Sequence, residues 1–154
     1  MPSHAAIAEK SLSFSPDTEV EKALKEMKKK KQDEAAIVNK DGEIEGVISL
    51  AIIMKNLLPV SVAMSDGIQL DVKVRAAPGV AKRLKKIYPL MVSDIMERKF
   101  ASIYPETPIW EAVNHLVNNT GPLVVVEGEN NKFIGMINSQ SAMEELQRLQ
   151  ESES

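Results

Sequence analysis

Cysteine is absent from the 154-residue sequence, and histidine occurs only as His4 and His115. Without thiols the chain can form no disulfide and has no thiolate metal ligand or cysteine nucleophile. Two widely separated histidines give neither the spacing of a metal site nor a recognisable catalytic triad. The sequence also lacks a Gly-x-Ser-x-Gly elbow and a phosphate-binding glycine loop. We therefore predict no catalytic residue, no metal site and no enzymatic activity.

Excess positive charge and long apolar runs are also missing. The formal net charge is -3 at pH 7, and aromatic residues make up 4% of the chain. Binding to nucleic acid favours a basic surface, with aromatic side chains for base stacking, so this composition argues against it. No apolar run approaches the length of a membrane span, and no charged and then apolar leader begins the chain. We expect a soluble cytoplasmic protein that binds neither nucleic acid nor membrane.

The sequence does contain an internal repeat. Ser-Pro-Asp-Thr at 15–18 corresponds to Tyr-Pro-Glu-Thr at 104–107, with the two prolines 89 positions apart. The same shift carries Gly46 onto Gly135 and places apolar residues of one copy on apolar residues of the other. A constant spacing over this distance is typical of a duplicated structural unit.

Each copy predicts the same five elements in the order strand, helix, strand, strand, helix. The evidence is helical spacing of apolar residues, short β-branched runs and a turn that makes the last two strands a hairpin. Asp17 or Thr18, and Glu106 or Thr107, are placed to cap the helix that follows them. The expected elements are 12–14, 20–27, 35–38, 44–49 and 50–58 in the first copy, and 101–103, 109–116, 123–126, 133–138 and 139–150 in the second.

These elements predict a mixed α/β (α+β) fold in which two βαββα repeats pack as a pseudo-twofold pair. Between the copies, alternation at 69–75 favours an extended segment, and the pattern at 79–88 favours a basic helix. The two tails have little apolar surface to bury and are expected to fray. The expected organisation is a tail at 1–10, repeats at 11–58 and 93–150 separated by an inserted linker at 59–92, and a tail at 151–154.

The end of each hairpin carries a family resemblance. Gly-x-Ile-Ser at 46–49 and Gly-x-Ile-Asn at 135–138 run directly into a helix, which resembles the CBS domain, named after cystathionine β-synthase. Two copies resemble a Bateman module, and the resemblance covers residues 12–58 and 92–149. It implies a sensor that binds AMP, ADP, ATP or S-adenosylmethionine as a regulatory ligand between the repeats, with no cofactor required. It also implies an effector protein, which the sequence does not name.

The ribose-binding motif of that family is a glycine, two residues, a Thr or Ser, two residues and an Asp. In the first copy Ser49 matches, but Ile52 stands at the acidic position. In the second copy Gly135 matches, whereas Asn138 and Ser141 replace the hydroxyl and the acid. Because the second copy keeps two polar side chains, we place the ligand there. The alternative is that both side chains only cap the last helix.

The resemblance also implies an apolar slot for the base between the first two strands of the second copy. Its residues would be Phe100, Ala101, Pro122 and Leu123, with backbone amides reading the base. The alternative interpretation is that these residues belong to the core and the strand edge.

Cations of the insertion are candidates to contact ligand phosphates, because the insertion lies between the two copies. These are Arg75, Lys82 and Arg83. The alternative is a solvated helix face. We interpret the lysine run at 28–31 as charge that complements the C-terminal end of its helix rather than as a phosphate site.

Two features predict an interface with a second copy of the chain. Trp110 lies off the apolar stripe of its helix, and the segment 50–58 is apolar on nearly all sides. We therefore expect a homodimer with Trp110, Ile53 and Leu57 at its interface. The main functional hypothesis is a regulatory module that binds an adenine nucleotide, and the alternative is a dimeric interaction scaffold without a ligand.

Overall fold

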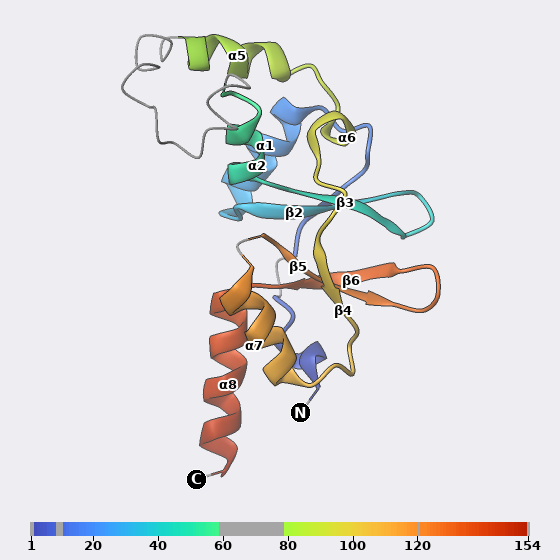
Figure 1. Ribbon diagram of the computed structural model, residues 1–154, viewed down its shortest axis with the longest axis vertical. Coiled ribbons are helices and arrows are strands. Elements are labelled where there is room, and N and C mark those ends of the chain that lie inside the picture. The colour runs from blue at the N-terminus through green and yellow to red at the C-terminus, as the bar shows by residue number, and fades with distance from the viewer. Residues whose placement is uncertain (1, 9–10, 59–78, 120, 154) are drawn as a thin grey trace.

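The computed structural model describes residues 2–8, 11–58, 79–119 and 121–153 of the chain. Two three-stranded sheets lie next to each other at the centre, with helices on their outer sides (Figure 1), which confirms the predicted mixed α/β fold. The first repeat contains β1 (Ser13–Phe14), α1 (Val20–Lys30), β2 (Glu34–Val38), β3 (Ile44–Ser49) and α2 (Leu50–Lys55), and the second contains β4 (Ala101–Ile103), α7 (Ile109–Asn118), β5 (Leu123–Glu127), β6 (Lys132–Ile137) and α8 (Ser139–Glu153).

The middle strand of each sheet is buried on both faces. In the first sheet β2 pairs in parallel with β1 and antiparallel with β3, and β4, β5 and β6 repeat this pattern. Leu123 and Val125 of β5 face the core of the second repeat, whereas Val124 and Val126 face the other sheet. Burial on both faces explains why these strands have continuous apolar sequences rather than alternating ones.

The repeats are joined by a shared core and by hydrogen bonds between their hairpins. Near the hairpin turns, the Phe133 N–H donates to the Gly42 carbonyl at 2.8 Å, and the Ile44 N–H donates to the Asn131 carbonyl at 3.2 Å. The two halves are therefore tied together on the hairpin side of the sheets. The buried residues of the shared core are Ala36, Val47, Val124, Val126 and Met136.

The N-terminal residues pack on the second repeat rather than on the first. The 3₁₀ helix η1 (Ser3–Ala6) contacts α7 and α8, and the N-terminus lies beside α7 in Figure 1. Ser3 and Ala6 are buried. The Ser3 N–H donates to the Thr107 carbonyl at 2.8 Å, and the Ser3 hydroxyl donates to the same oxygen at 2.6 Å. The expectation that the first ten residues fray is therefore wrong for residues 2–8.

A short helix that the sequence did not predict, α6 (Val92–Ile95), occupies the matching place on the first repeat. The Val92 N–H donates to the Thr18 carbonyl at 2.8 Å, as Ser3 does to Thr107. Ser3 lies 89 positions before Val92, and Thr107 lies 89 positions after Thr18, so the two contacts correspond under the repeat. The repeat thus extends upstream of the predicted strands, and each repeat is completed by the segment that precedes the other.

The insertion supports the beginning of α1. Its helix α5 (Gly79–Ile87), which confirms the predicted basic helix, packs against the core of the first repeat. The carbonyls of Leu90 and Tyr88 accept hydrogen bonds from the N–H groups of Val20 and Glu21 at 2.9 and 3.2 Å. These bonds satisfy amides that a side-chain cap would otherwise satisfy.

Other predictions of local structure need correction. No side chain caps α1 or α7; Asp17 instead accepts a hydrogen bond from the Ser15 hydroxyl. Helix α2 ends at Lys55, before the predicted end at 58, and α8 continues to Glu153, so the predicted fraying is wrong for 151–153. The extended segment predicted at 69–75 lies outside the described residues.

Candidate functional site

A cleft of about 940 Å³ lies between the two repeats, and we call it the central cleft. Corresponding positions of the copies line it, such as Met27 and Leu116 in the last turns of α1 and α7, and Leu50 and Ser139 at the beginnings of α2 and α8. A cleft of this size can hold a small-molecule ligand. The described lining residues are Leu24, Met27, Lys28, Lys31, Gln32, Asp33, Glu34, Leu50, Leu84, Tyr88, Leu116, Asn119, Gly121, Asn138, Ser139 and Gln140.

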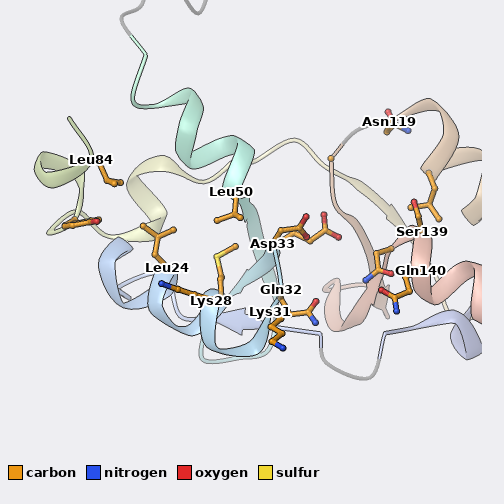
Figure 2. A pocket seen from close by; sticks show the side chains of 16 residues that line it. Leu24, Lys28, Lys31, Gln32, Asp33, Leu50, Leu84, Asn119, Ser139 and Gln140 are labelled. Atoms are coloured by element: carbon orange, nitrogen blue, oxygen red, sulfur yellow. The ribbon is translucent and has the colours of Figure 1, made fainter. Parts of the chain in front are cut away.

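Charged side chains gather where α1 leads into β2 (Figure 2). Lys28 and Lys31 come from the end of α1, and Asp33 and Glu34 precede or begin β2. Neither lysine forms a salt bridge with another described residue. Burial, with a smaller contribution from the charge of Asp33, raises the pKa of Glu34 to about 7. This wall therefore offers two cations and a carboxyl group that changes its charge near neutral pH.

Asn138 and Ser141 cap α8 through each other. The Asn138 Oδ1 accepts a hydrogen bond from the Ser141 N–H at 2.7 Å, and the Ser141 hydroxyl oxygen accepts one from the Asn138 N–H at 3.0 Å. This reciprocal arrangement is the capping role that the sequence left open. Asn138 also lines the central cleft, and the capped end of α8 faces that cleft with the positive end of the helix dipole.

A second cavity of about 470 Å³, the side cavity, lies where the N-terminal segment, the end of α1 and α8 meet. Glu145 is 7% exposed, and Arg148 donates two hydrogen bonds to its carboxylate at 2.7 and 2.6 Å. The hydrogen bonds from Arg148 lower the pKa of Glu145. The described lining residues are Ala5, Ile7, Ala8, Lys30, Lys31, Gln32, Asn138, Gln140, Ser141, Glu144, Glu145 and Arg148.

Comparison with protein families identifies the two copies. The family model of the CBS domain matches the chain twice, at residues 6–59 and 92–148. The chain belongs to the CBS-domain family. The tandem match confirms the resemblance drawn from the two hairpin ends.

Solved structures of CBS proteins share the fold. CBSX2, a CBS-pair protein from Arabidopsis thaliana, has a TM-score of 0.75 and 16% identity, with coverage of 97% of this chain and 96% of that one. CBSX2 in complex with AMP has a TM-score of 0.70 and 18% identity, covering 97% and 98%. A CBS domain-containing protein of unknown function from Bacillus anthracis has a TM-score of 0.71 and 14% identity, with coverage of 96% of this chain and 94% of that one. A comparison with curated proteins finds no match.

The residues that the CBS resemblance assigned to the base lie outside both cavities. Pro122 and Leu123 are buried, and Phe100 and Ala101 are half-buried. Ala101 is directly opposite Leu123 in the parallel pairing of β4 with β5, and both side chains pack in the core of the second CBS repeat. Ala101, Leu123 and Phe100 thus contribute to core packing, and their role in base binding stays a prediction.

The remaining residues of the predicted ribose motif also have local structural roles. Ser49 caps α2 by accepting a hydrogen bond from the Ile52 N–H at 3.1 Å, and it lines neither cavity. Gly135 is buried against Ile7 of the N-terminal segment. Of the predicted ribose-binding residues, Asn138 borders both cavities and Ser141 borders the side cavity.

The cations found in the cavities are not those predicted from the insertion. Lys82 is exposed and lines neither cavity, and Arg83 donates to the Leu58 carbonyl at 3.3 Å. Arg75 lies outside the described residues. Lys31 lines both cavities, although its lysine run was predicted to complement the end of the helix rather than to form a phosphate site. Lys31 lies between α1 and β2, three positions before that strand begins, and no motif in the sequence distinguishes it from the other lysines of its run.

The predicted interface residues separate into two groups. Trp110 is 65% exposed, whereas Ile53 and Leu57 are 2% and 7% exposed. Ile53 and Leu57 fill the core of the first CBS repeat together with Ile87 of α5. Their side chains are therefore covered by the chain itself and are not available to a second copy.

The described residues contain neither a membrane-spanning helix nor a metal-binding cluster. No helix in this part of the chain is long and apolar enough to cross a bilayer. Nor do three potential metal-ligating side chains gather anywhere within it.

Proposed function

We propose that this CBS pair is a regulatory module that binds an adenine nucleotide or another adenosyl compound between its repeats and thereby modulates an effector protein. The observation that carries the proposal is the central cleft, which corresponding positions of both repeats line. The shared fold with CBSX2, which has been crystallised in complex with AMP, supports the same reading. A ligand that contacts both repeats would stabilise one relative orientation of the repeats. An effector protein could respond to a change in that orientation.

The charges of the cleft suit a ligand with an anionic group. Lys28 and Lys31 can donate charge-assisted hydrogen bonds to phosphate or carboxylate oxygens. Asn138 and the beginning of α8 lie on the other repeat, where the helix dipole also favours negative charge. A phosphate held between these groups would connect the two repeats.

Calorimetry and thermal shift test this function. The full chain is titrated with AMP, ADP, ATP and S-adenosylmethionine, and a ligand at about one hundred times its dissociation constant should stabilise the fold by roughly 2.7 kcal/mol. Lys31→Ala and Asn138→Ala should weaken binding about tenfold, since each removes a charged or polar contact of about 1.4 kcal/mol. Asn56→Ala is the matched control, because Asn56 is exposed and lies outside both cavities.

The ligand-dependent shift is compared with the unliganded melting temperature of each variant, since loss of the α8 cap alone lowers stability. Binding by the wild type that Asn56→Ala leaves unchanged and Lys31→Ala weakens supports the proposal. Absence of binding to all four compounds at millimolar concentration would refute it.

A dimeric scaffold without a ligand is the second candidate. Its specific support is Trp110, exposed on α7, together with Val117, which is 76% exposed on the same helix. Ile52 at the acidic position of the first ribose motif also favours this reading. A concentration-dependent dimer that forms without any nucleotide, in a protein that binds none of the four compounds, would support the scaffold instead.

A further inference from the structure

The two ends of the central cleft differ because only one of them includes the insertion. Leu84 of α5, which Figure 2 shows, lines the cleft, and so does Tyr88, which follows α5. The described residues of the second repeat that line the cleft come from α7, the segment between α7 and β5, and the beginning of α8. The insertion therefore gives one end of a nearly symmetric cleft an apolar and aromatic surface.

Tyr88 is held in place by the backbone of α1. Its carbonyl accepts a hydrogen bond from the Glu21 N–H at 3.2 Å, and the Leu90 carbonyl accepts one from Val20 at 2.9 Å. The Tyr88 N–H itself donates to the Leu84 carbonyl at 3.2 Å. Leu84 packs against the core of the first repeat. The wall is thus anchored to regular structure, which limits the cost of ordering it when a ligand binds.

We propose that Tyr88 and Leu84 form the ring-binding end of the central cleft and take the base of a nucleoside ligand. The inference rests on the proposed function and names the part of the site that would recognise the base. It differs from the arrangement expected from the family resemblance, in which the base lies between the strands β4 and β5. Pro122 and Leu123, which belong to that expected slot, are buried in this chain.

The chemistry of this end suits a planar ring. Tyr88 is the one aromatic side chain among the described residues that line either cavity, and Leu24 stands beside Leu84 on the same wall (Figure 2). Tyrosine offers a flat face on which a base can stack, and leucine side chains cover the ring edge. The half-burial of all three side chains leaves part of each available to a ligand.

The spacing along α1 connects this end with the charged middle of the cleft. Leu24 and Lys28 are four residues apart on one helix, so they lie on the same face about one turn from each other. A ring against Leu24 and Tyr88 would place the next polar part of the ligand toward Lys28. The apolar end of the cleft would thus contact the base, and Lys28 would contact the phosphate, in the order in which these groups occur in a nucleotide.

Calorimetric titrations with AMP, adenosine and ribose 5-phosphate test the inference. Tyr88→Ala should weaken AMP and adenosine about tenfold, since stacking on an aromatic side chain contributes about that factor or more. Tyr88→Phe should bind as the wild type does, because it keeps the ring face. Ribose 5-phosphate has no base, so its affinity should be unchanged in every Tyr88 variant. Leu84→Ser, which leaves Tyr88 intact, should weaken the same two ligands.

Tyr104→Ala is the matched control, since Tyr104 is 49% exposed and lies outside both cavities. Unliganded melting temperatures verify that each variant folds. If Tyr88→Ala and Leu84→Ser bind AMP as tightly as the wild type, the inference is overturned and the proposed function stands. The same holds if these variants lose as much affinity for ribose 5-phosphate as for AMP. If the wild type binds neither AMP nor adenosine, both are overturned.

Discussion

Gly135 of β6 lies directly against the side chain of Ile7, so a Cβ built on Gly135 would overlap the Ile7 Cγ2 atom. The close approach lets the N-terminal segment bind the edge of the second sheet, where the Ala8 N–H donates to the Met136 carbonyl at 2.8 Å. We predict that Gly135→Ala lowers the free energy of unfolding by about 1 to 3 kcal/mol, as overpacking does. Chemical denaturation measures the change.

The double variant Ile7→Ala with Gly135→Ala distinguishes the steric contact with Ile7 from an effect of Gly135→Ala on the backbone conformation. Because the obstructing atom belongs to the Ile7 side chain, Gly135→Ala should lower the free energy of unfolding less in the Ile7→Ala background than in the wild type. Gly46 provides the contrast: its added Cβ would lie 2.7 Å from the Met96 Sδ and 2.8 Å from the Glu97 carbonyl oxygen. Met96→Ala should therefore not rescue Gly46→Ala. Equal rescue at both glycines would contradict this account.

Deletion of residues 1–8 should destabilise the second repeat although it removes none of that repeat's own strands. Ser3 and Ala6 are buried, and their loss would expose apolar surface of α7 and α8 and leave the Thr107 carbonyl without two of its hydrogen bonds. We expect a clear decrease in melting temperature. Deletion of 152–154 at the end of α8 is the control and should have a much smaller effect. Similar melting temperatures for the two deletions would show that η1 contributes little.

The sequence predicted the repeated elements well and their outer boundaries poorly. The strands and helices were found because apolar spacing persists under the shift from Gly46 to Gly135. The segments Ser3–Ala6 and Val92–Ile95 also correspond under that shift, but they share no identical residue and are too short for a helical periodicity. Their role depends on contacts with a distant part of the chain, which local patterns do not encode.

Glu34 should make stability depend on pH. Its pKa is raised from an ordinary value of 4.5 to about 7, first by burial and second by the charge of Asp33. The folded state therefore binds this proton more tightly than the unfolded state, and the free energy of unfolding decreases as pH rises from about 4.5 to 7. Glu34→Gln removes the ionisation. At pH 8 it should raise stability by on the order of 1 kcal/mol after allowance for solvent screening.

Melting temperatures measured from pH 4.5 to pH 8 check this prediction, which rests on the pKa of about 7. The wild type and Glu34→Gln should approach each other at the acidic end and separate at the alkaline end. Glu129→Gln, on the exposed hairpin of the second repeat, is the control for a general charge effect. A difference between wild type and Glu34→Gln that does not change with pH would contradict a raised pKa.

Trp110 should control self-association. The corresponding position of the first repeat is Glu21, which is paired with Lys25 at 3.7 Å, so an acidic residue is compatible with this place on the helix. We predict that Trp110→Glu converts a dimer to a monomer without lowering the melting temperature of the monomer, because the side chain is 65% exposed. Light scattering coupled to gel filtration measures the mass. Tyr104→Glu is the control, and a wild-type protein that is monomeric at all concentrations would refute the prediction.

The candidate site could be predicted only in part, since its position depends on the insertion. Asn138 was found because a motif identifies it, and it does line the central cleft. Ile53 and Leu57 were assigned to a surface because their segment is apolar on nearly all sides, but α5 covers them. Lys31 was assigned to a helix end, and the fold brings that end to both cavities. In each case the deciding neighbour comes from a remote segment.

Because η1 packs on the second repeat and α6 packs on the first, the repeats cannot be separated at a simple boundary in the sequence. A fragment that contains residues 91–149 would carry α6, which completes the first repeat, and would lack η1, which completes the second. We therefore expect that neither repeat folds when it is excised and that the pair is the smallest autonomous folding unit. Denaturation should accordingly proceed as a single cooperative transition, because η1 and α6 each link the unfolding of one repeat to the unfolding of the other.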